Sequence, residues 1–134
     1  MQETLTEKYP GAASWAFGDS SQMADELASL VISGIKTATC SAYACYDSDE
    51  PLPQIGRYNI ILNGEGVPVC VIRTTALQLV RFSDVTPALA AREGEGDLSL
   101  AYWQQEHQAF FTRQGCFSEE MELVFEQFEC VEVL

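Results

Sequence analysis

The sequence predicts an α+β fold, in which about five to six short strands curl into a small β-barrel flanked by two to three helices. Three observations predict it. Two β-branched runs surround the Asn-Gly pair at 63–64, which is the strongest hairpin signal in the chain. Two segments carry apolar residues at helical intervals of three and four. The last segment, 121–134, mostly alternates apolar with acidic residues, as in a half-buried strand.

The length of the chain sets the number of domains. Its 134 residues are enough for one domain with a buried core and too few for two typical ones. We therefore expect a single domain over 1–134, with 1–13 as a less ordered N-terminal segment. No apolar stretch is long enough to cross a bilayer, and residues 1–5 lack the basic-then-apolar order of a signal peptide. A cytoplasmic protein with no membrane partner is expected.

The charge balance restricts the partners. A net charge of -13 disfavours a broad nucleic-acid surface, because affinity for phosphate backbones comes mainly from cations. RNA is therefore a disfavoured partner, whereas a small pocket with a few positive groups remains compatible with this charge. The oligomeric state stays open.

Metal and cysteine chemistry have little support. The five cysteines lack the spacing of a zinc site or redox pair, and one histidine offers little to a metal, so we expect no metal and no cofactor. A nucleophilic Cys40 assisted by His107 is conceivable, but no third residue that would orient such a pair is evident. The favoured interpretation of each cysteine is a small buried apolar residue.

The first predicted helix covers about 22–33. Asp19, Ser20 or Ser21 can cap its start, and Gly34 ends it. An acidic, proline-bearing loop at 47–53 is expected to be exposed. Strands are then expected at 57–62, 67–75 and about 76–82, listed in chain order.

The second half of the chain is predicted to hold two helices. A short one runs over 88–92 after a capped start, and a longer one begins near Leu100, capped by Asp97 or Ser99 and ended by Gly115. The segment 93–97 between them cannot form a stable helix, because two glycines alternate with three acids. The tail is expected to be a half-buried strand or a bent pair of strands.

The stretch around Lys36 carries the most distinctive chemistry. Lys36 is one of two lysines in a chain with 20 acidic residues, and it enters a run of small hydroxyl-bearing residues just after a helix end. Such an amine either pairs with a carboxylate or contacts a polar ligand.

Residues 34–39, Gly-Ile-Lys-Thr-Ala-Thr, resemble the G-x-K-x-x-T motif of the ASCH domain family. Further segments match in order, from about Trp15 to the end of the chain. These are 15–18, 52–56, 69–72, and 93–97 with Trp103 and His107 behind it. The ordered set resembles the bacterial single-domain YhfF-like subgroup.

The resemblance implies a PUA-like β-barrel and several activities. ASCH domains were proposed as RNA-binding modules, some members are reported as ribonucleases, and small bacterial members hydrolyse N4-acetylcytidine with a lysine, a threonine and a glutamate. The lysine and threonine fall on Lys36 and Thr39, and the glutamate falls on Glu95, with Glu93 as its rival. The amidohydrolase pattern has an arginine where this chain has Ser41.

Two functions are held side by side, with a ribonuclease as a weaker third because a second histidine is missing. In one, the protein has a small pocket that binds a nucleoside- or nucleotide-like ligand, and it hydrolyses the amide of an N4-acylated cytidine. The other is a non-enzymatic RNA-binding or regulatory module. In the enzyme, Thr39 would either attack the acetyl carbonyl or position a water that does so. Neutral Lys36 would take the proton of this nucleophile, and Glu95 would deliver it to the leaving nitrogen. The further residues expected to contact ligand are Thr37, Ser41, Glu93, Tyr43, Arg57 and Arg73. Of these, Thr37 is the one that most resembles a turn threonine bonded to backbone.

Overall fold

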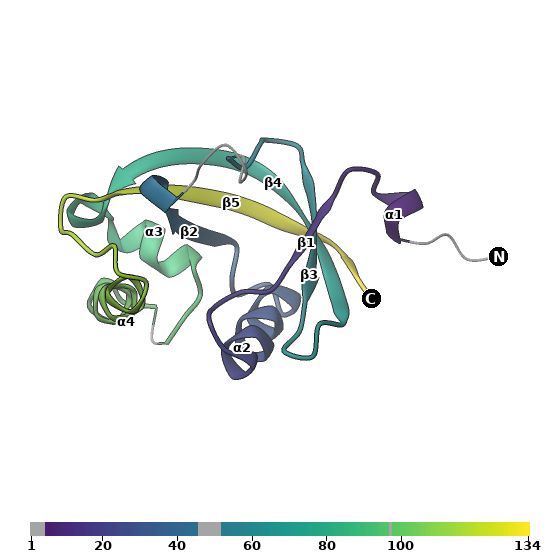
Figure 1. Cartoon of the computed structure of the whole chain (residues 1–134), viewed down its shortest axis with the longest axis horizontal. Coiled ribbons are helices and arrows are strands. Elements are labelled where there is room, and N and C mark those ends of the chain that lie inside the picture. The colour runs from purple at the N-terminus through teal and green to yellow at the C-terminus, as the bar shows by residue number, and fades with distance from the viewer. Residues whose placement is uncertain (1–4, 46–51, 97) are drawn as a thin grey trace.

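The computed structural model describes residues 5–45, 52–96 and 98–134 (Figure 1). Its helices are α1 (Leu5–Lys8), α2 (Ser21–Ile32), α3 (Pro87–Arg92) and α4 (Leu100–Arg113). Its strands are β1 (Ala13–Trp15), β2 (Ala38–Ala42), β3 (Tyr58–Leu62), β4 (Pro68–Arg81) and β5 (Glu122–Val133). Among the described residues, no helix has the length and apolar character needed to cross a membrane.

All five strands lie in one sheet of order β1-β3-β4-β5-β2. β1 pairs with β3 in parallel, and the remaining neighbours are antiparallel. The long strands β4 and β5 run together across the molecule and curve, so that the sheet forms a curled half-barrel (Figure 1). The predicted α+β fold with a PUA-like barrel is confirmed.

The strand prediction needs one correction. The third strand expected near 76–82 is not separate, because β4 continues to Arg81. A shift in the β4–β5 register between Thr74 and Ala76 marks a bulge, which bends a strand without ending it. Of the two alternatives for the tail, the single strand is confirmed, as β5. The predicted turn at 63–66 does join β3 to β4.

Local signals explain the helix ends. The Ser20 hydroxyl accepts the Met23 amide at the start of α2, and Ser99 does the same for Tyr102 at the start of α4. Gly34 follows α2 with a φ of 84°, a conformation that favours glycine. Asp97, the alternative cap for α4, lies outside the described residues.

The N-terminal segment is partly ordered. Residues 1–4 lie outside the described part of the chain, but Leu5–Lys8 form α1 and Tyr9 is buried against Ile60 and Val71. In the acidic loop expected to be exposed, residues 46–51 also lie outside the described part.

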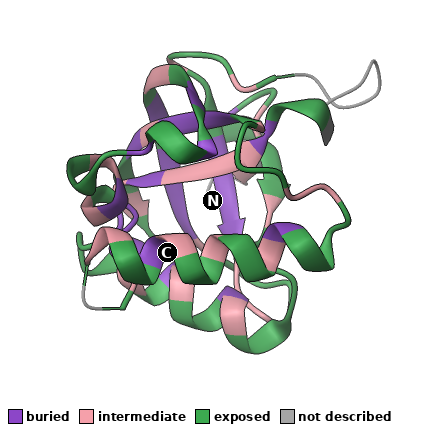
Figure 2. Cartoon of the chain, turned by 90° about the vertical axis from the view of Figure 1, so that its left-hand side faces the viewer, coloured by how far each residue is buried: buried purple, intermediate pink, exposed green. Residues whose placement is uncertain are grey.

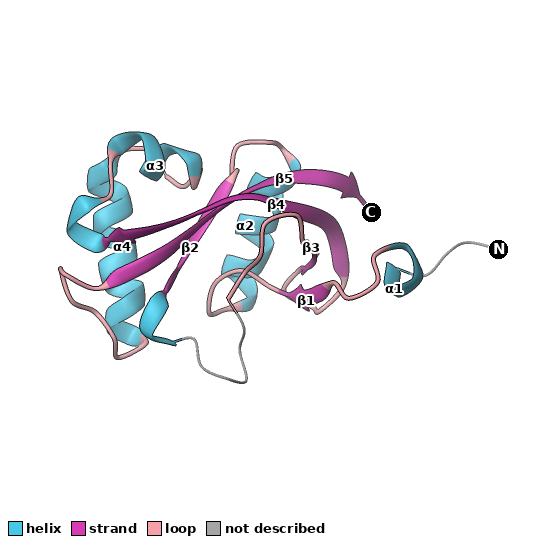
Figure 3. Ribbon diagram, turned by 90° about the horizontal axis from the view of Figure 1, so that it is seen from above, coloured by secondary structure: helices cyan, strands magenta, loops and turns pink. Residues whose placement is uncertain are grey.

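Two large apolar clusters fill the interior. One lies beneath α3 and α4 and includes Trp103, Phe111 and Phe125. The other lies between α2 and the sheet and includes Phe17 and Ile72. Buried positions follow the strands through the centre of the molecule (Figure 2), while α3 and α4 cover one end of the sheet and α2 its middle (Figure 3). β2 runs between these helices and carries Thr39, the last residue of the Gly-Ile-Lys-Thr-Ala-Thr motif.

Candidate functional site

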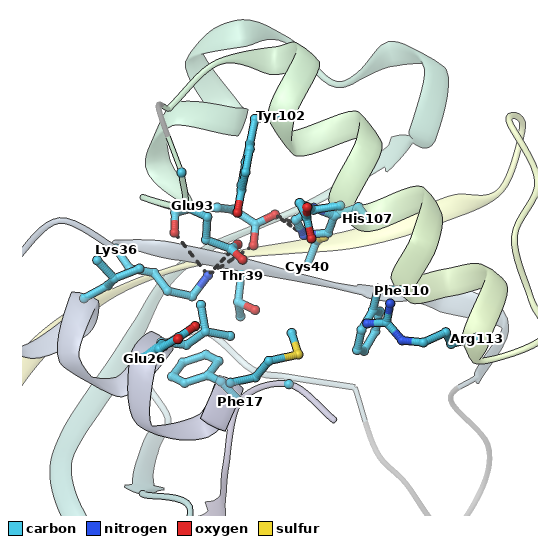
Figure 4. Close-up of a pocket in the computed structure, with 17 residues that line it drawn as sticks. Phe17, Glu26, Lys36, Thr39, Cys40, Glu93, Tyr102, His107, Phe110 and Arg113 are labelled. Carbon is cyan, nitrogen blue, oxygen red and sulfur yellow. Dashed lines mark hydrogen bonds and ion pairs between the residues drawn. The ribbon is translucent and has the colours of Figure 1, made fainter. Parts of the chain in front are cut away.

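Lys36 is held in place by the end of α2. The amides of Ile35 and Lys36 both donate to the carbonyl of Leu30, each at 3.0 Å, so the chain turns sharply after Gly34. The Lys36 side chain is only 1% exposed and points at the turn between α3 and α4 (Figure 4). Its backbone conformation therefore determines where the ammonium lies.

Two carboxylates surround this ammonium. Lys36 Nζ lies 3.2 Å from Glu93 Oε1 and 3.5 Å from Glu95 Oε2, and it also donates to the Glu93 carbonyl at 3.3 Å. The ring of Phe17 lies below it, with its centroid 5.4 Å from Nζ. Both glutamates that compete in the sequence motif thus contact Lys36.

Glu93 is the buried centre of the site. Its side chain is 2% exposed, and its Oε2 accepts the indole N–H of Trp103 at 2.5 Å and the Cys40 thiol at 3.2 Å. Burial by itself raises the pKa of Glu93, but the charges of Lys36 and His107 and these hydrogen bonds outweigh burial and lower it to about 2. Glu93 is therefore a permanent carboxylate whose oxygens are already occupied.

His107 completes this network. Its Nε2 lies 3.2 Å from Glu93 Oε2 and its Nδ1 lies 2.9 Å from the Trp103 carbonyl oxygen. Both neighbours only accept hydrogen bonds, so the form that satisfies both contacts is an imidazolium with a proton on each ring nitrogen. Burial lowers the pKa of His107, but the charge and hydrogen bond of Glu93 raise it above its ordinary value. The ring stacks on Trp103 with centroids 4.3 Å apart.

Glu95 differs from Glu93 in exposure and in charge. Its side chain is 19% exposed. Burial raises the pKa of Glu95 and neighbouring Glu93 adds to this, which together outweigh the opposing charge of Lys36. A carboxyl with a raised pKa takes up and releases a proton more readily near neutral pH than an ordinary glutamate.

A cavity of about 260 Å³ opens beside this cluster. Lys36, Thr39 and Glu95 line it together with apolar side chains from α2 and α4 (Figure 4). The apolar lining residues are Phe17, Met23, Leu27, Leu30 and Phe110, and the further charged ones are Glu26, Glu106 and Arg113. Arg113 is paired with Asp19 through a 3.0 Å contact.

β2 presents different chemistry on its two faces. Successive side chains of a strand point to opposite sides. Cys40 points up to Glu93 and His107, while Thr39 points down past the level of Lys36 (Figure 4). Burial, followed by the charge of Glu93, raises the pKa of the Cys40 thiol well above its ordinary value. Cys40 therefore acts as a hydrogen-bond donor and not as a thiolate nucleophile.

Cys40, Glu93 and His107 are also spaced like ligands of a metal, with their donor atoms within 4.8 Å of one another. These groups do not fit a cation as they stand. Cys40 is protonated, and Glu93 is neutralised by Lys36 and His107, whose positive charges would repel a metal ion.

The structure separates the remaining predicted residues from this cavity. Thr37 donates to the Arg92 carbonyl at 3.4 Å and lines neither cavity. Ser41 and Arg57 line a second cavity, whereas Tyr43 and Arg73 are exposed and line neither. The motif and the acidic turn thus come together, and the other predicted contacts do not join them.

Sequence reasoning missed three contributors. His107 was not among the expected site residues, yet it contacts Glu93. Cys40 and Arg113 were not assigned to the site either. The helical stripe shared by Trp103 and His107 was the available signal, because it places the indole and the imidazole one turn apart.

The family model of the ASCH domain matches residues 13–132. The chain belongs to the ASCH domain family. This ASCH domain shares 40% identity with protein EF3133 from Enterococcus faecalis V583, assigned to DUF984; the match covers 92% of this chain and 82% of that one, with a TM-score of 0.82. An ASCH domain from Lactobacillus crispatus JV V101 is 36% identical over 98% of this chain and 86% of that one, with a TM-score of 0.85.

A third solved structure shares only the fold. The hypothetical protein PH0355 is 11% identical, with a TM-score of 0.60 over 90% of this chain and 99% of that one. None of the curated proteins matches the chain. The family predicted from the motifs of the ASCH domain is confirmed, and its activity has to be argued from the site.

Proposed function

We propose that this ASCH domain binds a small, uncharged nucleoside-like ligand and hydrolyses the amide of an N4-acylated cytidine. The observation that carries the proposal is the position of Lys36, which is held between Glu93 and Glu95 at the wall of a cavity that Thr39 also lines. An ammonium, a carboxyl group and a hydroxyl group are together sufficient for amide hydrolysis without a metal.

Lys36 acts as a hydrogen-bond donor to the amide carbonyl. Its Nζ lies 3.2 Å from Glu93 Oε1 and 3.5 Å from Glu95 Oε2. An ammonium held in a buried site stabilises the negative charge that develops on the carbonyl oxygen as it is attacked. The proposal therefore gives Lys36 this role in place of the neutral base considered from the sequence.

Glu95 moves the proton. Its carboxylate takes a proton from a water while the water oxygen bonds to the carbonyl carbon. The carbon–nitrogen bond then breaks, and the Glu95 carboxyl returns the proton to the leaving N4 nitrogen. The products are a carboxylic acid and cytidine. The raised pKa of Glu95 suits both directions of this transfer.

Thr39 and Glu93 support these steps. The Thr39 hydroxyl holds the attacking water at the boundary of the cavity. Glu93 is a positioning residue, because its oxygens bind Lys36, Trp103, Cys40 and His107 and leave no room for substrate. Attack by Thr39 itself is the competing route, and it would leave an acyl group on the protein.

The cavity lining favours an uncharged acyl group. Glu26, Glu95 and Glu106 face the same space as Lys36. Arg113 also lines it but is already paired with Asp19. A phosphate or a carboxylate there would therefore meet an excess of acidic groups. This argument, together with the net charge of -13, weighs against RNA as the bound partner.

The test is hydrolysis of N4-acetylcytidine by the purified protein, followed by chromatography of cytidine and acetate. Lys36→Met and Glu95→Gln are each expected to lower kcat by about 100-fold or more, as for loss of an oxyanion donor or a general base. Thr39→Val should also lower kcat, and mass spectrometry of the quenched reaction reports any acyl-enzyme.

Two matched variants control for general effects. Lys8→Met removes the other lysine, which is exposed and paired with Glu132, and Glu119→Gln removes an exposed acid. Both should keep wild-type kcat, and circular dichroism should show that every variant is folded. No turnover by the wild type, or full turnover by folded Lys36→Met, would sink the proposal.

A further inference from the structure

A second cavity of about 620 Å³ adjoins the one beside Lys36. The two share a boundary formed by Phe17, Gly18, Thr39, Cys40 and Phe110. Thr39 thus lies where a ligand spanning both cavities would pass from one to the other. The second cavity is more than twice as large as the first.

Glu126 is the buried acid of this second cavity. It lies on β5, is 6% exposed, and lines the cavity. Glu126 is the direct cross-strand partner of Thr39 in the β2–β5 pair, so the two side chains stand next to each other on one face of the sheet. The buried acid is therefore adjacent to the proposed reaction centre.

One oxygen of the Glu126 carboxyl group is bound within the protein, because the Thr74 hydroxyl donates to its Oε2. Burial raises the pKa of Glu126, which the Thr74 hydrogen bond only partly offsets. Because the side chain also lines the cavity, a ligand there can form a hydrogen bond with this carboxyl group.

A second polar group lines the same space. Asn59 is 8% exposed, and its Oδ1 accepts the indole N–H of Trp15 at 3.0 Å. This contact fixes the orientation of the amide and leaves its NH₂ group as a donor. Both Asn59 and Trp15 line the second cavity. A flat apolar indole and two oriented polar groups are typical of a site for a planar heterocycle.

We propose that the second cavity is the subsite for the nucleoside half of the substrate, and that Glu126 hydrogen-bonds the polar edge of the pyrimidine. This rests on the proposed function, in which the acyl group occupies the cavity beside Lys36. The smaller cavity then takes the acyl group, the larger one takes base and sugar, and the scissile amide lies at Thr39. Glu126 is a specificity-determining residue of the site.

The probe is cytidine, the product, measured by isothermal titration calorimetry so that binding is read without turnover. Glu126→Leu should weaken cytidine binding about tenfold or more, as expected when a buried hydrogen bond to a ligand is lost. Glu126→Gln keeps a donor and an acceptor and should stay within about threefold of wild type. Lys8→Met, at an exposed lysine that lines neither cavity, should leave cytidine binding unchanged.

Glu122→Gln, an exposed acid on the same strand, is the matched control and should bind as the wild type does. With N4-acetylcytidine as substrate, Glu126→Leu should raise KM by a similar factor and change kcat less. Absence of cytidine binding to the wild type, or equal binding by a folded Glu126→Leu protein, overturns the inference. Cytidine binding that depends on Glu126 in a protein without turnover would uphold the subsite and reject the hydrolase.

Discussion

Gly94 lies directly against the backbone of Ile35. A Cβ at position 94 would come within 2.7 Å of the Ile35 carbonyl oxygen and 2.8 Å of the Lys36 nitrogen. Gly94 also has a φ of 72°, in the left-handed region. The close approach brings the acidic turn onto the lysine loop, and it is what places Glu93 and Glu95 on either side of Lys36.

Gly94→Ala should therefore destabilise the protein strongly. The left-handed conformation alone costs about 1–2 kcal/mol for a residue with a Cβ, and the backbone clash adds to it. Gly66→Ala is the matched control, because Gly66 has a φ of 79° but nothing within 4 Å of its Cβ position. Urea denaturation should show a larger loss for Gly94→Ala, and equal losses would contradict the packing argument.

Glu93→Gln is expected to lower the free energy of unfolding by about 3–5 kcal/mol, because it removes the buried anion that Lys36 and His107 share and leaves Lys36 with Glu95 alone. Glu119→Gln, at an exposed position, should change it by less than about 0.5 kcal/mol. Adding Lys36→Met to Glu93→Gln should cost less than the sum of the single changes, since the two residues share one ion pair. Strict additivity would mean that the pair is not coupled.

The pH dependence of stability follows from the same groups. The pKa of Glu93 is lowered from 4.5 to about 2. This group therefore contributes stability that is present above about pH 4.5 and is lost as the pH falls towards 2. The pKa of His107 is raised above 6.5, so its contribution is present below about pH 6.5 and is lost as the pH rises through its folded pKa. The pKa values of Glu95 and Glu126 are also raised, so their contributions are present below about pH 4.5 and are lost as the pH rises through their folded pKa values.

Stability should thus be greatest near about pH 4.5, decline above it as Glu95 and Glu126 ionise, and decline further above about pH 6.5 as His107 loses its proton. Urea denaturation at several pH values from 3 to 9, as rough limits, measures it. In His107→Gln the decline above about pH 6.5 should be shallower than in the wild type. A wild-type stability that rises steadily across the alkaline range would show that His107 is not charged in the folded protein.

The acyl group should be selected by the lining of the first cavity. Apolar neighbours such as Leu27 and Phe110 accept a butanoyl group, whereas Glu26 and Glu106 repel a succinyl group. We expect kcat/KM for N4-butanoylcytidine to remain near that for the acetyl compound. For N4-succinylcytidine we expect kcat/KM to fall by about tenfold, which corresponds to about 1.4 kcal/mol. Glu26→Gln with Glu106→Gln should recover part of this difference. A succinyl compound used as well as the acetyl one would contradict this placement.

Much of the fold could be predicted because its signals are local. The cap at Ser20, the stop at Gly34 and the Asn-Gly turn depend on backbone geometry that neighbouring residues specify. The length of β4 could not be predicted, because the bulge near Thr74 is defined by its pairing with β5 and not by the residues around it.

The residues of the candidate site also fall into two groups, those with a local sequence signal and those that only contacts between distant segments identify. Lys36 and Thr39 stand out in the sequence as a motif, whereas the choice between Glu93 and Glu95 depends on burial that only the packed structure shows. Glu126 gave no signal, because acids alternate with apolar residues throughout the tail and the buried acid looks like the others in sequence. Contacts between distant segments therefore account for most of what was missed.

The two-faced chemistry of β2 has a consequence for evolution by insertion and deletion. Since Thr39 and Cys40 point to opposite sides, a change of one residue in the length between Lys36 and Thr39 would exchange them. The hydroxyl would then take the place of the thiol beside Glu93 and His107, and the thiol would take the place of the hydroxyl beside Glu126. We therefore expect relatives to differ in loop length on either side of this segment, while the three-residue step from lysine to threonine stays constant.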